Sequence, residues 1–521
     1  MKRLAPLLAT VGLIATSVPL LTATQAAAAQ VPGYMRQQPD WHRCSPDQPV
    51  TYECATLKVP LDYQHPQGRM LDLAISRIKT ENTGKRRGVL LFNPGGPGAS
   101  SLFRPVDLDT RIPKDVRDQY DLIGFDPRGV GKSSPISCGL STNERGLGGP
   151  YRPETFASDV AWARSVADKC REKSGDVIPH ITTRNTARDL DVIRAALGER
   201  KISYLGYSYG TYLGAVYSQM FPQRTDRFVL DSGVDPQRVW RGMIQVWATE
   251  AEPAFARWTR WAAERSDRYG LGTTPEEVSA TFWNLVARAD RDPIVHNGEK
   301  VTGENLRSEP SLFFSPYGAS AVIKFLKSLA ENGPGPANGD APDLKQLLAG
   351  SRSSGATASE LDTPGPGAAA AAVASDSGSD GMAVYWSVVC GDTDAWPRDP
   401  DQYARDAARD KAKYPLYGDF ASNIKPCAFW QRPVEPATPM KTRANVLTVQ
   451  NEWDSQTPLV SGQGLHKALK GSRMVLALGG EKHGVYLSEP ASCADVTVNK
   501  YLATGRLPAA DVTCQDPPPF P

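Results

Sequence analysis

The sequence lacks a surplus of charge of either sign. Its 521 residues contain 59 lysines and arginines against 57 aspartates and glutamates, a formal net charge of +2, and no long basic run occurs. Proteins that bind nucleic acid or an anionic membrane surface concentrate positive charge on one stretch or face. We therefore expect neither nucleic acid nor an anionic membrane surface as a partner.

The N-terminal apolar run, Leu4–Leu21, is a poor candidate for a membrane span, because two prolines interrupt a run that is only just long enough. Two basic residues precede the run, and three alanines at 27–29 offer a small-residue cleavage site. We predict that residues 1–29 are a signal peptide and that the protein is secreted and extracellular, free of the membrane once the signal is removed. The polar residues 30–40 form either a short pro-segment or a loose terminus.

The chain contains no Cys-x-x-Cys pair, a spacing that is common in zinc and thiol redox sites. In a chain predicted to be exported, its eight cysteines fit disulfides better than metal ligands or a catalytic thiol. Many connectivities are open to eight cysteines, and loop length favours the pairing of sequence neighbours. The expected bridges are Cys44–Cys54, Cys138–Cys170, Cys390–Cys427 and Cys493–Cys514.

The central motif of the chain is Gly-Tyr-Ser-Tyr-Gly at residues 206–210. A short apolar run, Ile202–Leu205, precedes it, and a helical pattern over Thr211–Phe221 follows it. A strand, a tight turn carrying Gly-x-Ser-x-Gly and a helix predict a nucleophile elbow, in which Ser208 is forced outward in a strained conformation. Gly214 shares a helix face with the last glycine of the motif, so the helix is expected to lie close on the sheet.

Strands and helices alternate on both sides of this motif, which predicts an α/β core with a mostly parallel sheet flanked by helices. Strands are expected at 71–75, 89–92, 120–125, 202–205, 227–230, 445–450 and 473–478, and a helix at 185–197. The core is predicted to comprise residues 41–235 and 439–521.

A largely helical cap is predicted to interrupt the core over residues 236–438, which hold a cluster of tryptophans. Within it, residues 331–380 are low in complexity and rich in Gly, Ala, Ser and Pro, and we expect a loop there. A separate second domain is the alternative, but it would leave the first part of the core without its last strands.

A serine hydroxyl becomes a good nucleophile when a base takes its proton and an acid orients that base. In elbow-type hydrolases the chain order is serine, acid, histidine, and only His296, His466 and His483 follow Ser208. His296 falls within the cap, and His466 falls in a helix, where it is most simply a surface residue. His483 follows the strand predicted at 473–478, so we predict that His483 is the general base.

The acid is expected in the loop that follows the strand at 445–450. Asp454 occupies a position there that is open to the site, and we favour it. Glu452 is the competing candidate, and ordinary surface charge is the alternative for both residues.

An oxyanion hole needs two backbone N–H donors. One is expected from Tyr209, the residue after the nucleophile. The other is expected from Gly96 in the loop after the strand at 89–92, where a glycine run lets the backbone approach a substrate closely. A purely structural turn is the alternative for this run.

Several motifs resemble one family. Asn-Pro-Gly-Gly-Pro-Gly at 93–98 is similar to the His-Gly-Gly-Pro-Gly loop of the prolyl aminopeptidase group of α/β-hydrolases, with Asn-Pro in place of the usual first residue. Together with Gly-Phe-Asp-Pro-Arg-Gly-Val-Gly at 124–131 and Ser-Tyr-Gly-Thr-Tyr-Leu-Gly-Ala at 208–215, it looks like the secreted bacterial tripeptidyl aminopeptidases. The likeness covers nearly the whole mature chain, including the order of the cysteines, and is weakest in the cap.

The resemblance implies an α/β-hydrolase fold with Ser208 as nucleophile, Asp454 as orienting acid and His483 as base, without a metal or an organic cofactor. Members of the family remove short peptides, often of three residues, from free N-termini, and some prefer a single proline. The expected protein is a monomeric serine aminopeptidase that acts on peptide or protein N-termini through an acyl-enzyme.

Other functions fit the same scaffold. A carboxylesterase or lipase would use the same three residues, because fold alone does not set the substrate, and a prolyl aminopeptidase or a non-catalytic peptide-binding protein are further alternatives. An aminopeptidase must bind a protonated α-amine. Glu250 and Glu252, early in the cap, are the candidates for that role, and two solvated helix charges are the alternative.

Overall fold

The computed structural model describes residues 1, 32–296, 299–309, 311–333, 381–488 and 491–516. Residues 2–29 of the predicted signal peptide and 334–380 of the predicted low-complexity segment lie outside the described residues. In the segment predicted as a pro-segment or loose terminus, the Gln37 side chain donates to the Lys58 carbonyl and accepts from the Lys58 N–H, at 2.7 and 2.8 Å. These bonds attach the segment to the neighbouring strand.

A ten-stranded mixed sheet forms the centre of the molecule, with the order β1-β2-β3-β5-β4-β6-β7-β10-β11-β12. The strands are β1 (His42–Arg43), β2 (Tyr52–Pro60), β3 (Met70–Ile78), β4 (Gly88–Asn93), β5 (Tyr120–Phe125), β6 (Ile202–Tyr207), β7 (Thr225–Asp231), β10 (Val446–Asn451), β11 (Arg473–Leu478) and β12 (Val512–Gln515). Pairing is antiparallel from β1 to β5 and parallel from β5 to β12. The α/β class predicted from the sequence is confirmed.

The central strands are buried along their whole length, which explains their unbroken apolar sequences. Every residue of β4, β5, β6 and β10 is buried. Side chains alternate between two faces, so Leu90 and Leu205 contribute to one hydrophobic cluster while Leu91 and Tyr204 contribute to the other. Parallel strands covered by helices on both faces have this composition.

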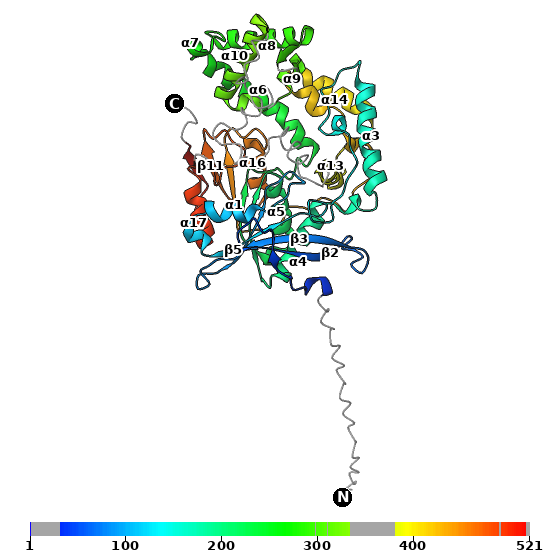
Figure 1. Cartoon of the computed structure of the whole chain (residues 1–521), viewed down its shortest axis with the longest axis vertical. Coiled ribbons are helices and arrows are strands. Elements are labelled where there is room, and N and C mark those ends of the chain that lie inside the picture. Colours follow the sequence, from blue (N-terminus) through cyan, green and yellow to red (C-terminus); the bar gives the residue numbers. More distant parts are fainter. Residues whose placement is uncertain (2–31, 297–298, 310, 334–380, 489–490, 517–521) are drawn as a thin grey trace.

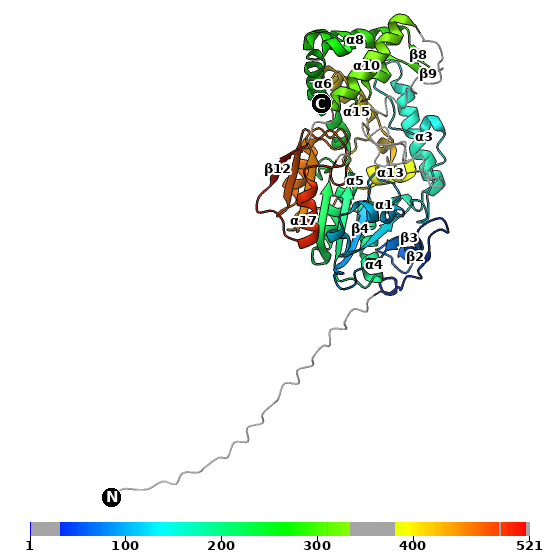
Figure 2. The same cartoon turned by 60° about the vertical axis from the view of Figure 1, so that its left-hand side comes forward.

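Helices cover both faces of the sheet. One face packs against α1 (Arg104–Arg111), α2 (Lys114–Arg117) and α17 (Asp495–Thr504), and the other against α4 (Thr183–Ala196), α5 (Tyr209–Met220) and α16 (Leu459–Ala468). Figure 2 shows α17 next to β12, at the edge of the sheet.

The helix α5 lies very close to the sheet, as the sequence predicted. A Cβ on Gly214 would come within 2.6 Å of Leu230 and 2.7 Å of the Tyr204 ring. The Tyr204 hydroxyl also donates to the Gly210 carbonyl at 2.9 Å. A larger residue at position 214 would push the helix, and the turn that precedes it, away from β6 and β7.

The segment between β7 and β10 is largely helical. It contains α6 (Arg241–Ala263), α7 (Ser266–Tyr269), α8 (Pro275–Arg291), α9 (Gly303–Arg307), α10 (Pro316–Asn332), α13 (Gly381–Gly391), α14 (Pro400–Lys413) and α15 (Gly418–Ser422), with a small hairpin of β8 (Ile294–His296) and β9 (Glu299–Val301). In Figures 1 and 2, α6, α8 and α10 gather at the opposite end of the molecule from β2 and β3. Because α10 extends to Asn332, the first two residues of the predicted low-complexity segment are helical.

This helical layer has its own aromatic core. Phe255 and Trp258 on α6 pack against Phe282 on α8 and Phe313, with ring centroids 4.8–6.1 Å apart. Aromatic rings bury large apolar areas in edge-to-face and offset contacts. These four aromatic side chains therefore stabilise the helical layer as a packed unit.

The eight cysteines form four disulfides between sequence neighbours, as predicted. The bridges are Cys44–Cys54, Cys138–Cys170, Cys390–Cys427 and Cys493–Cys514. The first joins β2 to the segment just before it. The second joins α3 (Phe156–Ser174) to the loop before it, and the third ties α13 to the turn at 426–429. The fourth holds the edge strand β12 to the segment that precedes α17.

The Asp-Pro-Arg-Gly motif after β5 forms a buried ion pair. The Arg128 guanidinium donates to both carboxylate oxygens of Asp189 on α4, at 2.6 and 2.7 Å, and both side chains are fully buried. It also donates to the carbonyls of Pro60, Leu61 and His180. One side chain thus joins the β5 loop, the end of β2 and the start of α4.

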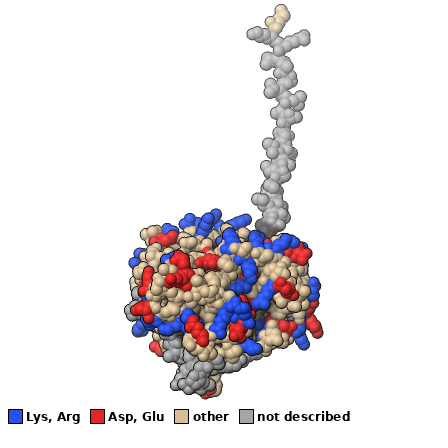
Figure 3. All heavy atoms as spheres, turned by 90° about the horizontal axis from the view of Figure 1, so that it is seen from above, with Lys and Arg blue, Asp and Glu red and all other residues tan. Residues whose placement is uncertain are grey.

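Surface charge is intermingled on the face seen in Figure 3, where Lys and Arg side chains lie among Asp and Glu side chains. Among the described residues, no helix has both the length and the apolar character needed to cross a membrane.

Candidate active site

Ser208 forms the turn between β6 and α5, with φ 57° and ψ −123°. A positive φ is strained for a residue with a side chain and persists only where the surroundings fix it. Here the Ser208 N–H donates to the Asp231 carbonyl at 3.0 Å. The Ser208 carbonyl accepts from the Thr211 N–H and hydroxyl at 2.9 and 2.6 Å. The hydroxyl is thereby presented at the start of a helix, where peptide N–H groups and the helix dipole favour negative charge.

Asp454 and His483 form a hydrogen-bonded pair that places His483 at the pocket lined by Ser208. His483 Nδ1 lies 2.9 Å from each carboxylate oxygen of Asp454, and the Asp454 side chain is fully buried. The carboxylate also accepts from the N–H groups of Gln456 and Thr457 and from the Thr457 hydroxyl, at 2.8, 3.0 and 3.1 Å. Because a carboxylate only accepts, we assign the proton to Nδ1, which leaves Nε2 as the basic nitrogen of the ring.

The competing candidates contact other partners. Glu452 accepts from the Gly479 N–H at 2.8 Å. His466 on α16 bonds to Ser472 and Asp511. His296 on β8 packs edge-on against the Phe325 ring in the helical layer. The structure therefore brings Asp454, and not Glu452, to His483.

Two residues that the sequence did not single out hold the histidine loop. The Asp231 carboxylate accepts from the N–H groups of Val485 and Tyr486, and the Ser232 hydroxyl accepts from the Gly484 N–H. Burial raises the pKa of Asp231 to about 7. Since the main chain of Asp231 also bonds to Ser208, one residue fixes the serine turn and the loop of His483 together. Asp231 is the last residue of the parallel strand β7, and this position is the sequence signal that could have identified it.

The loop after β4 lies directly over the serine turn. A Cβ on Gly95, which has φ 107°, would come within 2.9 Å of the Ser208 Cβ and 3.2 Å of the Tyr209 nitrogen. Gly96 also has a positive φ and lines the same cavity as Ser208. Tyr209 is the first residue of α5, so its N–H has no acceptor within the helix. Of the two predicted oxyanion donors, Tyr209 directly follows Ser208 and Gly96 lines the same pocket.

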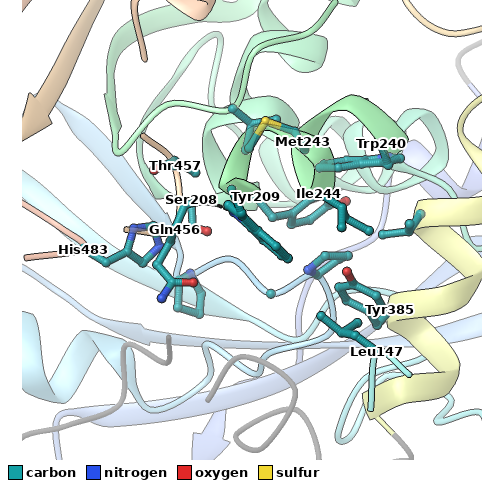
Figure 4. Close-up of a pocket in the computed structure, with 16 residues that line it drawn as sticks. Leu147, Ser208, Tyr209, Trp240, Met243, Ile244, Tyr385, Gln456, Thr457 and His483 are labelled. Carbon is teal, nitrogen blue, oxygen red and sulfur yellow. Dashed lines mark hydrogen bonds between the residues drawn. The ribbon is translucent and has the colours of Figure 1, made fainter. Parts of the chain in front are cut away.

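A largely apolar pocket opens beside Ser208 and His483 and encloses about 780 Å³, part of which is open to solvent. Its walls come from the 94–97 loop, α6, α13 and the loops around Leu147 and Thr457. The lining residues are Pro94, Gly96, Pro97, Leu147, Ser208, Tyr209, Val234, Trp240, Met243, Ile244, Trp247, Tyr385, Val389, Gln456, Thr457 and His483. In Figure 4, His483 and Ser208 lie toward one end of the pocket and Tyr385 and Leu147 toward the other.

The two predicted amine anchors lie on α6, and neither lines this pocket. Glu250 lies on the same face of α6 as Met243 and Trp247, because Trp247 is four residues and Glu250 seven residues after Met243. Partial burial raises the pKa of the Glu250 carboxyl, and no ion pair of Glu250 occurs among the described residues. Glu252 lies on another side of the helix and accepts from the Leu416 N–H at 3.1 Å.

A second link joins α6 to the histidine loop. The Arg257 guanidinium donates to the Glu481 carboxylate, two residues before His483. The same guanidinium lies over the Trp453 ring, 4.2 Å from its centroid. The helical layer is thereby attached to the loops of both Asp454 and His483. In the described part of the chain, no cluster of His, Cys, Asp or Glu is arranged to hold a metal ion.

A serine held at positive φ between a parallel strand and a helix, with a buried Asp–His pair from later loops, defines an α/β hydrolase. Residues 88–283 match the family described as alpha/beta hydrolase fold, and residues 414–514 match the family described as TAP-like protein. The protein is an enzyme, a serine hydrolase.

The relatives name the branch of this class. The chain is 36% identical over 498 residues to the tripeptidyl aminopeptidase of Streptomyces lividans. The matched region covers 91% of this chain and 86% of that relative. It is 32% identical over 485 residues to the serine protease Hip1 of Mycobacterium tuberculosis, and the match covers 88% of this chain and 87% of that protein. The carboxylesterase B of Mycobacterium tuberculosis is 29% identical over 533 residues, and the match covers 96% of this chain and 95% of that protein. The chain belongs to the tripeptidyl aminopeptidase family and is a serine peptidase.

Proposed function

We propose that this protein is a secreted serine aminopeptidase that releases short peptides, chiefly tripeptides, from free N-termini through an acyl-enzyme. The observation that carries the proposal is the Asp454–His483 pair at the pocket that Ser208 lines. All three residues come from one chain, so a monomer suffices for activity.

In the first half of the reaction, Ser208 Oγ attacks the carbonyl carbon of the scissile bond while His483 Nε2 takes the hydroxyl proton. Asp454 stays ionised and stabilises the imidazolium. The N–H groups of Gly96 and Tyr209 bind the oxyanion. The C–N bond then breaks, and His483 gives its proton to the leaving amine.

In the second half, a water molecule takes the place of the leaving amine. His483 removes a proton from the water as it attacks the ester carbonyl of the acyl-enzyme. Collapse of the second tetrahedral intermediate returns the proton to Ser208 Oγ and releases the short peptide with a free carboxylate.

The free α-ammonium of the substrate is bound by Glu250. Its carboxylate is partly desolvated and forms no ion pair among the described residues, since the nearby Arg238 guanidinium pairs with Asp235. It also follows the pocket-lining residues Met243 and Trp247 along one face of α6. Glu252 is the weaker candidate, because it lies off the helix face of Met243 and Trp247.

Secretion rests on the predicted signal at residues 1–29 and on the four disulfides. Disulfides form and persist in oxidising compartments outside the cytosol. Mass spectrometry of the protein recovered from culture medium tests secretion, and an N-terminus near residue 30 is the expected result.

The activity is tested with matched peptides that carry either a free or an acetylated N-terminus, with mass spectrometry of the products. We expect release of tripeptides from the free peptides, little turnover of the acetylated ones, and none by Ser208→Ala. Ser208 should also be labelled by a fluorophosphonate. Equal rates on free and acetylated peptides would reject the aminopeptidase, and turnover of acyl esters alone would favour a carboxylesterase.

A further inference from the structure

The pocket beside Ser208 has a defined direction relative to the reacting bond. His483 must reach the leaving amine to protonate it, so the leaving group lies at the His483 end. Tyr385 and Leu147 lie toward the opposite end (Figure 4). The deep part of the pocket therefore faces the acyl side of the substrate, which stays attached to Ser208.

The deep walls are almost entirely hydrocarbon. Trp240, just before α6, and Met243 and Ile244 on α6 line the pocket together with Tyr385 and Val389 from α13 and with Leu147. No Asp, Glu, Lys or Arg is among the described residues that line the pocket. An ammonium group would lose its hydration there without gaining an ionic partner, so the N-terminus of the substrate does not enter. An apolar side chain gains by leaving water.

The shape of these walls is fixed from behind by a buried polar network. The Trp240 indole N–H donates to the Asp392 carboxylate at 3.2 Å. The Thr183 N–H and hydroxyl reach the same carboxylate at 2.8 and 2.6 Å, and the Tyr209 hydroxyl lies 3.0 Å from the Thr183 hydroxyl. Trp240 and Tyr209 are thus held by hydrogen bonds as well as by packing on each other, with ring centroids 5.9 Å apart, and this wall of the pocket does not move without breaking these bonds.

From this geometry we infer that the pocket receives the side chain of the residue that supplies the scissile carbonyl, and that the enzyme selects peptides with a large apolar residue at that position. The inference rests on the proposed aminopeptidase activity and names its substrate class. Glycine or alanine there leaves the pocket unfilled, and a charged side chain has no partner in it.

The test is a series of tripeptide nitroanilides, Ala-Ala-X, with free N-termini and X as Ala, Leu, Phe, Asp or Lys. We expect kcat/KM for Leu and Phe to exceed that for Ala by about 10- to 100-fold and that for Asp or Lys by about 100-fold or more. Rates within threefold across the series overturn the inference while leaving the aminopeptidase in place. If no nitroanilide is cleaved but N-acetyl esters of the same five residues are, the proposed function fails. The order of rates on the esters then tests the pocket.

A variant pair locates the selectivity. Val389→Phe fills the deep end, so the Phe/Ala ratio of kcat/KM should fall at least tenfold through loss of Phe turnover. Val295→Phe makes the same change on β8, where Val295 is exposed, and should keep the wild-type ratio. Fluorophosphonate labelling reports whether each variant retains a folded site. An unchanged ratio in labelled Val389→Phe overturns the assignment of this pocket.

Discussion

His483 Nδ1 lies at the same distance, 2.9 Å, from the two carboxylate oxygens of Asp454. An amide in place of the carboxylate would present one N–H to the ring and would no longer hold the proton on Nδ1. We therefore expect Asp454→Asn to lower kcat by about a thousandfold to ten-thousandfold. Steady-state kinetics on the best nitroanilide measures this.

Glu452→Gln is the matched control for that change. Glu452 accepts from the Gly479 N–H, and a glutamine oxygen can accept the same bond. We expect kcat within a few fold of wild type. If Glu452→Gln does the greater harm, the assignment of Asp454 as the orienting acid is wrong.

Glu250→Gln should raise KM for free-amine peptides by about 10- to 100-fold, because a hydrogen bond to a charged group contributes about 1.5–3 kcal/mol. The kcat at saturation should change less, since Glu250 does not line the pocket of Ser208 and His483. Glu252→Gln serves as the control, because its oxygen can still accept from the Leu416 N–H. Equal KM values for Glu250→Gln and wild type would remove Glu250 from the site.

The buried pair of Arg128 and Asp189 predicts a large stability effect. Asp189→Asn leaves the Arg128 guanidinium without a counter-ion in a site where both side chains are fully buried. Breaking such a pair costs about 3–5 kcal/mol, to be measured as the change in urea midpoint. Lys58→Ala breaks the exposed pair with Asp72 and should change the free energy of unfolding by less than about 1 kcal/mol.

Much of the sheet could be predicted because parallel strands are short apolar runs with clear ends. The predicted bounds of β5 and β11 agree with the structure at both ends. Three strands of the sheet were missed for different reasons. The first, β1, has only two residues, both exposed. In β2, buried Ala55, Leu57 and Val59 alternate with more exposed residues, a signal that was present in the sequence. The edge strand β12 is four residues long and partly exposed, so its apolar signal is weak.

The site was predicted through chain order, which narrows the choice of histidine and acid before any contact is known. What that order could not supply is how the loops are held together. Asp231 acts on Val485 and Tyr486, more than 250 positions away, so its role exists only once β7 and the histidine loop meet. The same holds for Arg257 and Glu481, which come together only when α6 folds over the core.

The disulfides differ in the length of chain that they close, and this predicts a ranking. The Cys390–Cys427 bridge spans 37 residues and the Cys44–Cys54 bridge spans 10. Loop-closure entropy in the unfolded chain makes the longer bridge more stabilising by about 1 kcal/mol, within a total of about 2–4 kcal/mol for each bridge. Double Cys→Ser variants compared by urea unfolding test this. A larger loss at Cys44–Cys54 would mean that native packing, and not loop length, sets the order.

Lys425 predicts a pH dependence of stability. Its ammonium nitrogen donates to the Phe420 carbonyl at 3.0 Å, the residue is 1% exposed, and burial lowers the pKa of Lys425 to about 7. The unfolded chain keeps a lysine pKa of about 10.4. Between about pH 7 and pH 10 the unfolded state therefore binds a proton that the folded state does not, and folding becomes more favourable as pH rises.

The slope is up to about 1.4 kcal/mol per pH unit for this one group. Lys425→Met has no group that titrates at this position. The free energy of unfolding of the wild type, minus that of the variant, should therefore increase between pH 7 and pH 9.5. Taking the difference cancels groups that titrate alike in both proteins, and the intact disulfides leave no free cysteine to add a further titration. Lys467→Met is the control, because Lys467 is exposed on α16 and its difference from wild type should stay constant. Parallel curves for Lys425→Met and wild type would show that Lys425 keeps its proton in the folded protein.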